Sequence, residues 1–145
     1  MRAILLAGGL TAVTAFATFA PPVQPGGERT TWDSVYTAAQ SARGDTLYHA
    51  SCAKCHGAAL EGTANDGGPL TGAMFLGNWS GLGMDQLFDK AYTTMPSDKP
   101  KSLPRKDYAD ILAYVLARNQ FPAGSTALPD SMELLREIKL VAAKP

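Results

Sequence analysis

The chain of 145 residues lacks the features that would place it in several common classes of protein. It has 13 basic and 13 acidic residues, so its formal net charge is zero, and its longest basic cluster is the short run Lys99–Lys106. That run predicts a solvated loop face rather than the basic patch of a nucleic-acid-binding protein, so no nucleic-acid partner is expected. Strand-like alternation of useful length is also missing, which argues against a sheet protein. The length suits a single domain.

Cysteine and histidine are scarce, with two residues of each type. A structural zinc site normally takes four ligands, and Cys52, Cys55 and His56 would leave only His49 to complete one. A thioredoxin-like cysteine pair is expected at a strand-to-helix junction of an α/β chain, and the sequence has no such pattern. His49 is interpreted as a surface or packing residue. The usual zinc and dithiol sites are therefore disfavoured.

The stretch Cys52-Ala-Lys-Cys55-His56 is the most informative part of the sequence. Two cysteines separated by two residues and followed at once by histidine form the pattern for covalent attachment of a c-type haem. The two thiols can reach the two vinyl groups of one porphyrin, and the adjacent imidazole can bind the iron. We therefore predict one haem c, attached through Cys52 and Cys55, with His56 as an axial ligand. Because both cysteines are used in this way, no disulfide is expected.

The N-terminal region has the composition of a targeting segment. Arg2 is followed by an uncharged stretch over residues 3–20 that is rich in Ala, Leu, Thr and Phe. This pattern predicts a secretory signal peptide over residues 1–20, cleaved after Ala17 or Ala20, and a retained membrane anchor is the alternative. Because no second long apolar run follows, we expect an exported, periplasmic protein with no permanent membrane span after cleavage.

Composition divides the remainder of the chain into three segments. Residues 21–31 are rich in proline and glycine and are expected to form a flexible linker. Residues 32–128 hold the predicted domain. Residues 129–145 are expected to form a C-terminal helical extension, opening near Asp130 and packed on the outside of that domain.

Apolar periodicity and end signals predict three helices in the domain, over residues 35–51, 84–92 and 104–118. Asp33 or Ser34 is the expected cap of the first. Gly44 lies within it, and a helix tolerates glycine where a neighbouring backbone must come close. Alternatively, Gly44 ends one helix and a second begins after it. The helix over residues 104–118 is expected to bury one apolar face.

The segment over residues 57–83 contains eight glycines together with apolar residues. It predicts a long connection with little regular structure. Aromatic and aliphatic content argues against disorder, and glycine allows a backbone to approach a flat ring closely, so we expect this loop to wrap an apolar cofactor. Trp79 is expected either to lie on the haem or to be an ordinary core tryptophan.

A second axial ligand is needed on the face of the haem opposite His56, and methionine is the leading choice. Met84 belongs to a predicted apolar helix face, and Met74 and Met132 lie in the glycine-rich loop and the C-terminal extension. Met95 lies in a proline-bounded loop and has no helical role, so it is the favoured ligand. A lysine ligand and an open coordination site are the alternatives.

Several short motifs together resemble one family. They are Gly44-x-x-x-Tyr48, the haem motif with its following glycine, Gly68-Pro69, Met95-Pro96 and Ile-Leu-Ala-Tyr over residues 111–114. With them the chain resembles class I monohaem cytochromes c. The stretch over residues 113–124 resembles exported bacterial cytochromes c that serve quinoprotein alcohol or sugar dehydrogenases.

The resemblance implies an all-α cytochrome c fold, with three to five helices wrapped around one covalently bound haem and long glycine-rich loops. It implies ligation of the iron by His56 and Met95, and a hydrogen bond from the His56 ring to the carbonyl of Pro69. It also implies that Gly44 and Tyr48 pack against the helix over residues 104–118.

The function that follows is one-electron transfer rather than enzyme catalysis, since no nucleophile–base pair accompanies the haem. A periplasmic dehydrogenase is the expected donor, and another cytochrome or a terminal oxidase is the expected acceptor. Two alternatives stay open: a haem-bearing subunit of a larger dehydrogenase complex, and a haem enzyme or gas sensor in which Met95 is a labile ligand.

Overall fold

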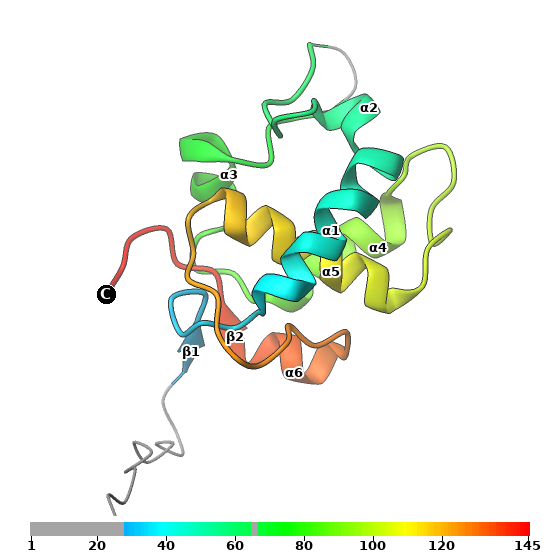
Figure 1. The fold of residues 1–145 in the computed structure, drawn as a ribbon. Coiled ribbons are helices and arrows are strands. Elements are labelled where there is room, and N and C mark those ends of the chain that lie inside the picture. Colours follow the sequence, from blue (N-terminus) through cyan, green and yellow to red (C-terminus); the bar gives the residue numbers. More distant parts are fainter. Residues whose placement is uncertain (1–27, 65–66) are drawn as a thin grey trace, which may run out of the picture.

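The computed structural model describes residues 28–64 and 67–145, which form six helices and one pair of short strands (Figure 1). The predicted signal peptide, residues 1–20, lies outside the described residues, as does most of the predicted linker. The elements in chain order are β1 (Arg29–Thr30), α1 (Ala38–Ser51), α2 (Ala53–His56), α3 (Gly72–Trp79), α4 (Met84–Thr94), α5 (Arg105–Arg118), α6 (Met132–Arg136) and β2 (Ile138–Lys139). The prediction of a mainly helical chain is confirmed.

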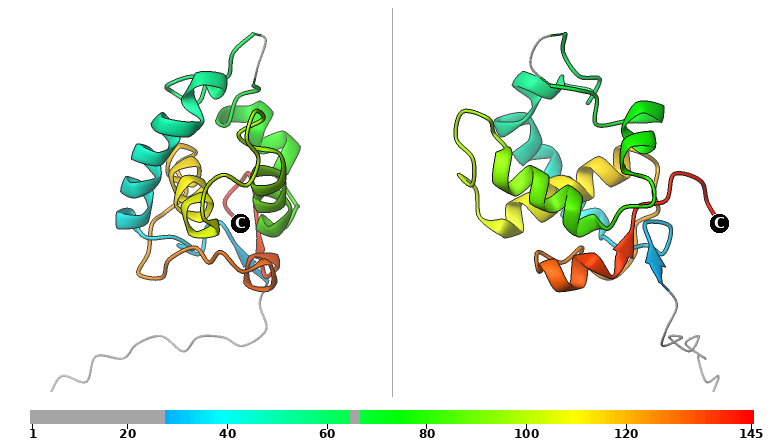
Figure 2. Two further views of the ribbon diagram at one scale, coloured as in Figure 1. Left: turned by 90° about the vertical axis from the view of Figure 1, so that its right-hand side faces the viewer. Right: turned by 180° about the vertical axis from the view of Figure 1, so that it is seen from behind.

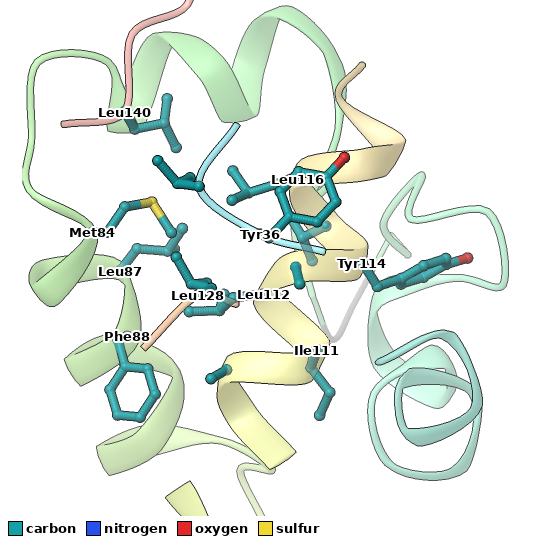
Figure 3. Close-up of a cluster of buried hydrophobic side chains, with 14 of the residues drawn as sticks. Tyr36, Met84, Leu87, Phe88, Ile111, Leu112, Tyr114, Leu116, Leu128 and Leu140 are labelled. Atoms are coloured by element: carbon teal, nitrogen blue, oxygen red, sulfur yellow. The ribbon is translucent and has the colours of Figure 1, made fainter. Parts of the chain in front are cut away.

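Helix α5 is the centre of the fold. It lies between α1 on one side and α4 on the other (Figure 2). Every residue from Tyr108 to Leu116 is buried, which confirms the predicted apolar face and extends it around the helix. A helix covered on most of its circumference is a core element. Figure 3 shows Leu87 and Phe88 of α4 in one buried cluster with Leu112 of α5.

Gly44 allows α1 and α5 to cross at very short range. A Cβ at this position would overlap the main-chain carbonyl of Asp110 and would lie 3.0 Å from the amide nitrogen of Ile111. One turn later, Tyr48 is completely buried and its ring lies 5.4 Å from that of Tyr114. The packing of Gly44 and Tyr48 on the helix predicted over residues 104–118 is confirmed, and α1 is continuous through the glycine.

A buried carboxylate reinforces the same crossing. Asp110 is 1% exposed and accepts two hydrogen bonds from the Arg43 guanidinium, at 2.7 Å and 3.0 Å, and one from Lys106 Nζ at 2.9 Å. Burial acts to raise the pKa of Asp110, but the hydrogen bonds from Arg43 and Lys106 outweigh it and lower the pKa below 3.8. The charged form is therefore the one that the fold stabilises.

Replacing Asp110 by asparagine is expected to lower the free energy of unfolding at pH 7 by about 2 kcal/mol, because charge-assisted hydrogen bonds are lost from a buried site. A carboxyl whose pKa is depressed by folding stabilises the fold above its unfolded pKa and loses that contribution as the pH falls through its folded value. The difference between the parent and Asp110→Asn should therefore begin to shrink as the pH falls below 3.8. Urea unfolding at pH 7 and at pH 3 measures both points, and an equal difference at the two pH values would contradict the assignment.

The two ends of the described chain meet in a small parallel sheet that the sequence did not predict. Arg29 pairs with Ile138 and Thr30 with Lys139, and β1 and β2 lie side by side (Figure 1). Thr31 is completely buried and its amide donates to the Lys139 carbonyl at 2.9 Å. The expectation that the linker extends to residue 31 is therefore wrong for residues 29–31.

The C-terminal segment belongs to the core rather than to the outside of the domain, which corrects the prediction. Its helix is short, and the chain continues as strand β2. Leu135, Ile138 and Leu140 are all almost completely buried. The Leu140 main chain exchanges hydrogen bonds with the Gly81 amide and the Leu82 carbonyl, which ties the segment to the turn before α4.

Two further boundaries differ from the prediction. Helix α1 begins after Thr37, whose side chain accepts from the Gln40 amide, and not after Asp33 or Ser34. The glycine-rich segment contains helix α3, with Phe75 buried against the core, where no helix was expected. In the part of the chain that the structure describes, no helix is both long and apolar enough to cross a membrane.

Candidate haem-binding site

A cavity of about 290 Å³ lies among the helices, and we refer to it as the central cavity. Its wall is mainly apolar and is formed by residues from several elements and loops: Ser51, Cys52, Cys55, His56, Gly68, Pro69, Leu70, Phe75, Asn78, Trp79, Leu87, Lys90, Ala91, Met95, Pro96, Ser97, Leu103, Tyr108, Ile111, Leu112 and Val115. All six site residues proposed from the sequence are among them, so the fold brings together positions up to 43 residues apart (95 − 52).

The C-terminal end of α1 and the short helix α2 present the haem motif. Helical hydrogen bonds run from the Cys52 amide to the Tyr48 carbonyl and from the His56 amide to the Cys52 carbonyl, at 2.8 Å and 3.0 Å. Residues three and four positions apart on such a turn share one face, so Cys52, Cys55 and His56 all reach the cavity. Burial, with a smaller contribution from Cys55, raises the pKa of Cys52 to about 11, so this thiol is protonated at neutral pH.

Tyr48 holds the residue that follows the motif. Its hydroxyl donates a hydrogen bond to the Gly57 carbonyl at 2.6 Å, and the ring is completely buried. Burial raises the pKa of the Tyr48 phenol, which therefore remains a donor throughout the ordinary pH range. The turn that carries His56 is thus fixed to α1 at both of its ends.

The ring of His56 is oriented by a main-chain carbonyl. Its Nδ1 lies 2.8 Å from the Gly68 oxygen. A carbonyl can only accept, so Nδ1 carries the hydrogen and the lone pair of Nε2 remains available to bind a metal. The resemblance implied the carbonyl of Pro69 in this role. The structure places the preceding carbonyl there instead, and Pro69 itself lines the central cavity.

The close approach of this loop to the motif requires a glycine. A Cβ at Gly67 would lie 2.7 Å from the Cys55 carbonyl oxygen and 2.9 Å from His56 Nδ1. The Thr63 hydroxyl also donates to the Cys55 carbonyl, at 2.9 Å. The main chain of the loop therefore packs directly on the haem motif, as the glycine content of the loop suggested.

The methionines of the described residues fall into clearly different environments. Met84 is completely buried in the core, Met74 is 65% exposed on α3, and Met132 is partly buried against the core. Of these described methionines, only Met95 lines the central cavity. Lys90, the residue type named as the alternative ligand, also lines it.

Trp79 and His49 occupy positions that the sequence analysis considered: Trp79 at the core and the cavity, and His49 at the surface. Trp79 lies at the end of α3, packs against the core and also lines the central cavity. His49 is about half exposed, and its Nδ1 lies 3.0 Å from both the main-chain and the side-chain oxygen of Asp45. The cavity wall is formed without His49.

Two polar side chains beside the site were not recognised from the sequence as site residues. The Tyr108 hydroxyl donates to the Met95 carbonyl at 2.7 Å. The Asn119 side chain accepts from the Gly72 amide and donates to the Leu70 carbonyl, at 3.1 Å and 2.9 Å, and so fixes the segment leading out of the loop. In the sequence, Tyr108 lies in the helix predicted over residues 104–118 and Asn119 directly follows that helix, and no local pattern indicates a second role for either residue.

The comparison with protein families gives one match, to the family described as "Cytochrome C oxidase, cbb3-type, subunit III", over residues 39–115. This range is more than half of the chain and includes every residue that lines the central cavity. The chain belongs to this cytochrome c family. Searches of curated proteins and of solved structures gave no match.

The residues of this cytochrome c domain fit one covalently attached haem. Two cysteines and a histidine with a free ring nitrogen face a single cavity whose other walls are mainly apolar. The thiols supply the thioether attachment, and the imidazole is a suitable iron ligand. The prediction of one haem c, attached through Cys52 and Cys55, is confirmed at the level of the family.

Proposed function

We propose that this cytochrome c domain is an exported, periplasmic one-electron carrier whose haem c is ligated by His56 and Met95. Bound haem supplies the single-electron couple between ferric and ferrous iron. The remaining roles belong to the chain: its mainly apolar wall would keep water away from the iron, and the side chains of His56 and Met95 would hold the iron. An iron site with no open position favours electron transfer over substrate chemistry.

The observation that carries the proposal is the placement of Met95. Among the described methionines it is the one that lines the same cavity as His56. Met84 is buried in the core, and Met74 is exposed to solvent. A neutral thioether paired with imidazole favours the ferrous state and raises the potential, as suits a carrier that accepts electrons from a dehydrogenase.

For the partners, we propose a periplasmic dehydrogenase of the quinoprotein class as donor and another cytochrome or a terminal oxidase as acceptor. The donor rests on the resemblance of residues 113–124 to cytochromes that serve such enzymes. Proteins that exchange electrons transiently use small interfaces, so binding should be weak and fast.

A second candidate is a haem-bearing subunit of a larger complex. The description of the matched family, which names a subunit of an oxidase, favours it. A partner that co-purifies in a stoichiometric amount would support this candidate, whereas recovery of the holoprotein alone from periplasmic extracts would support a free carrier.

The spectrum of the ferric holoprotein tests the ligation. We expect the weak far-red band typical of methionine–sulfur bound to ferric haem, little change on addition of cyanide at modest concentration, and no rapid carbon monoxide binding by the ferrous protein. Rapid binding of either ligand, without the far-red band, would contradict electron transfer and support an open site that binds gas or substrate.

A further inference from the structure

The short loop between α4 and α5, residues 95–104, presents Met95 to the central cavity. We propose that Tyr108, in the first turn of α5, is a positioning residue for Met95: its hydroxyl fixes the Met95 main chain and so keeps the thioether at the cavity. This inference rests on the proposed ligation of the haem by Met95. It adds the interaction that keeps Met95 in position for that ligation.

The Met95 main chain is held from two helices at once. Its amide donates to the Ala91 carbonyl at the end of α4, at 3.0 Å. Its carbonyl accepts from the Tyr108 hydroxyl at 2.7 Å. Since both backbone polar groups are bonded to different helices, the Cα of Met95 cannot move away from the cavity unless one of these bonds breaks. The bond to Tyr108 is the one that joins the Met95 main chain to α5.

Packing fixes the ring of Tyr108, so the hydroxyl does not simply follow the loop. The side chain is 3% exposed, and its ring makes edge-on contacts with Tyr92 at 5.3 Å and Phe88 at 6.4 Å, both on α4. The guanidinium of Arg105 lies over the rings of Phe88 and Tyr92, at 4.6 Å and 5.0 Å from their centroids. The Tyr108 ring is therefore fixed between α4 and α5, and its hydroxyl in turn fixes the Met95 main chain.

The test compares two tyrosine variants of the holoprotein. Tyr108→Phe removes the hydroxyl and keeps the ring contacts. Tyr36→Phe is the matched control, because the Tyr36 hydroxyl also donates to a buried carbonyl, that of Phe121, at 2.6 Å, and Tyr36 does not line the central cavity. The readout is the rate at which cyanide replaces the methionine ligand in the ferric protein, followed by loss of the far-red band.

We expect cyanide to react about three- to tenfold faster with Tyr108→Phe than with the parent, which corresponds to the loss of one ordinary hydrogen bond that holds the ligand in place. Tyr36→Phe should react at the parent rate even where its stability is reduced. Equal cyanide rates in the two variants would overturn the positioning role. A parent without the far-red band would instead overturn the proposed ligation, so the two failures are distinguishable.

A measurement on the parent protein covers the case in which Tyr108→Phe yields no folded holoprotein. In the proton NMR spectrum of the ferrous form, the Tyr108 hydroxyl proton should exchange slowly with water and lie close to the main-chain protons of Met95 and Pro96. A Tyr108 hydroxyl that exchanges as fast as a solvated phenol would overturn the proposal.

Discussion

Replacing Met95 by alanine is expected to lower the reduction potential, abolish the far-red band and open the iron to carbon monoxide. Axial ligands set haem potentials over a span of about 0.8 V, so loss of the thioether should lower the potential by on the order of 0.1 V or more. The sign follows because a thioether favours ferrous iron more strongly than water, hydroxide or an amine does. Redox titration with optical detection measures the potential and the band, and the optical spectrum of the ferrous protein with added carbon monoxide measures the third effect.

Met74→Ala provides the matched control for this experiment. It removes the same side chain from a position that is 65% exposed on α3 and does not line the central cavity. Its potential and spectrum should equal those of the parent. If Met95→Ala retains the parent potential and band, Met95 is not the ligand. The double variant with Lys90→Ala then asks whether the lysine in the cavity wall takes that position.

The second large effect is expected at the crossing of α1 and α5. Gly44→Ala should lower the free energy of unfolding by at least about 2 kcal/mol, because overpacking a tight contact costs about 1–3 kcal/mol. The obstacle here is the Asp110 main-chain carbonyl, which cannot rotate away as a side chain would. Adding a methyl group therefore forces the two helices apart, along with the Tyr48 and Tyr114 rings that pack beside the crossing.

Gly77→Ala separates this steric effect from helix propensity. Gly77 also lies within a helix, α3, but a Cβ there would meet nothing within 4 Å. Alanine is favoured over glycine in a helix by about 0.5–1 kcal/mol, so Gly77→Ala should be neutral or stabilising. Denaturant unfolding of both holoproteins gives the comparison. Equal stability of Gly44→Ala and the parent would mean that the helices are not in close contact at this position.

The sequence predicted the features that depend on local pattern. The haem motif is a fixed spacing of reactive side chains, and the helices that became α4 and α5 have apolar residues at helical intervals, so both could be recognised. For Gly44 the sequence left two alternatives open, and the structure has the one in which glycine lies within a helix beside a close neighbour. For the haem motif and the two helices, the pattern that reveals the feature lies within a few helical turns of sequence.

Features that depend on distant partners could not be predicted in this way. Strands β1 and β2 are two residues long, too short to show alternation, and Arg29 and Ile138 meet only because the whole fold lies between them. The main-chain oxygen that orients His56 is that of Gly68 and not that of Pro69, a shift of one residue that depends on the loop path. Tyr108 resembles any core tyrosine until its hydroxyl is seen on Met95.

The position of the haem motif ahead of α5 has a consequence for the order of events in biosynthesis. A chain made from its N-terminus completes Cys52–His56 long before Arg105–Arg118, the helix that covers α1. Strand β2, which pairs with β1, comes later still. The two thiols are therefore synthesised before the residues of α3, α4 and α5 that line the same cavity. The wall of the central cavity is complete only when α5, which supplies Tyr108, Ile111, Leu112 and Val115, is in place.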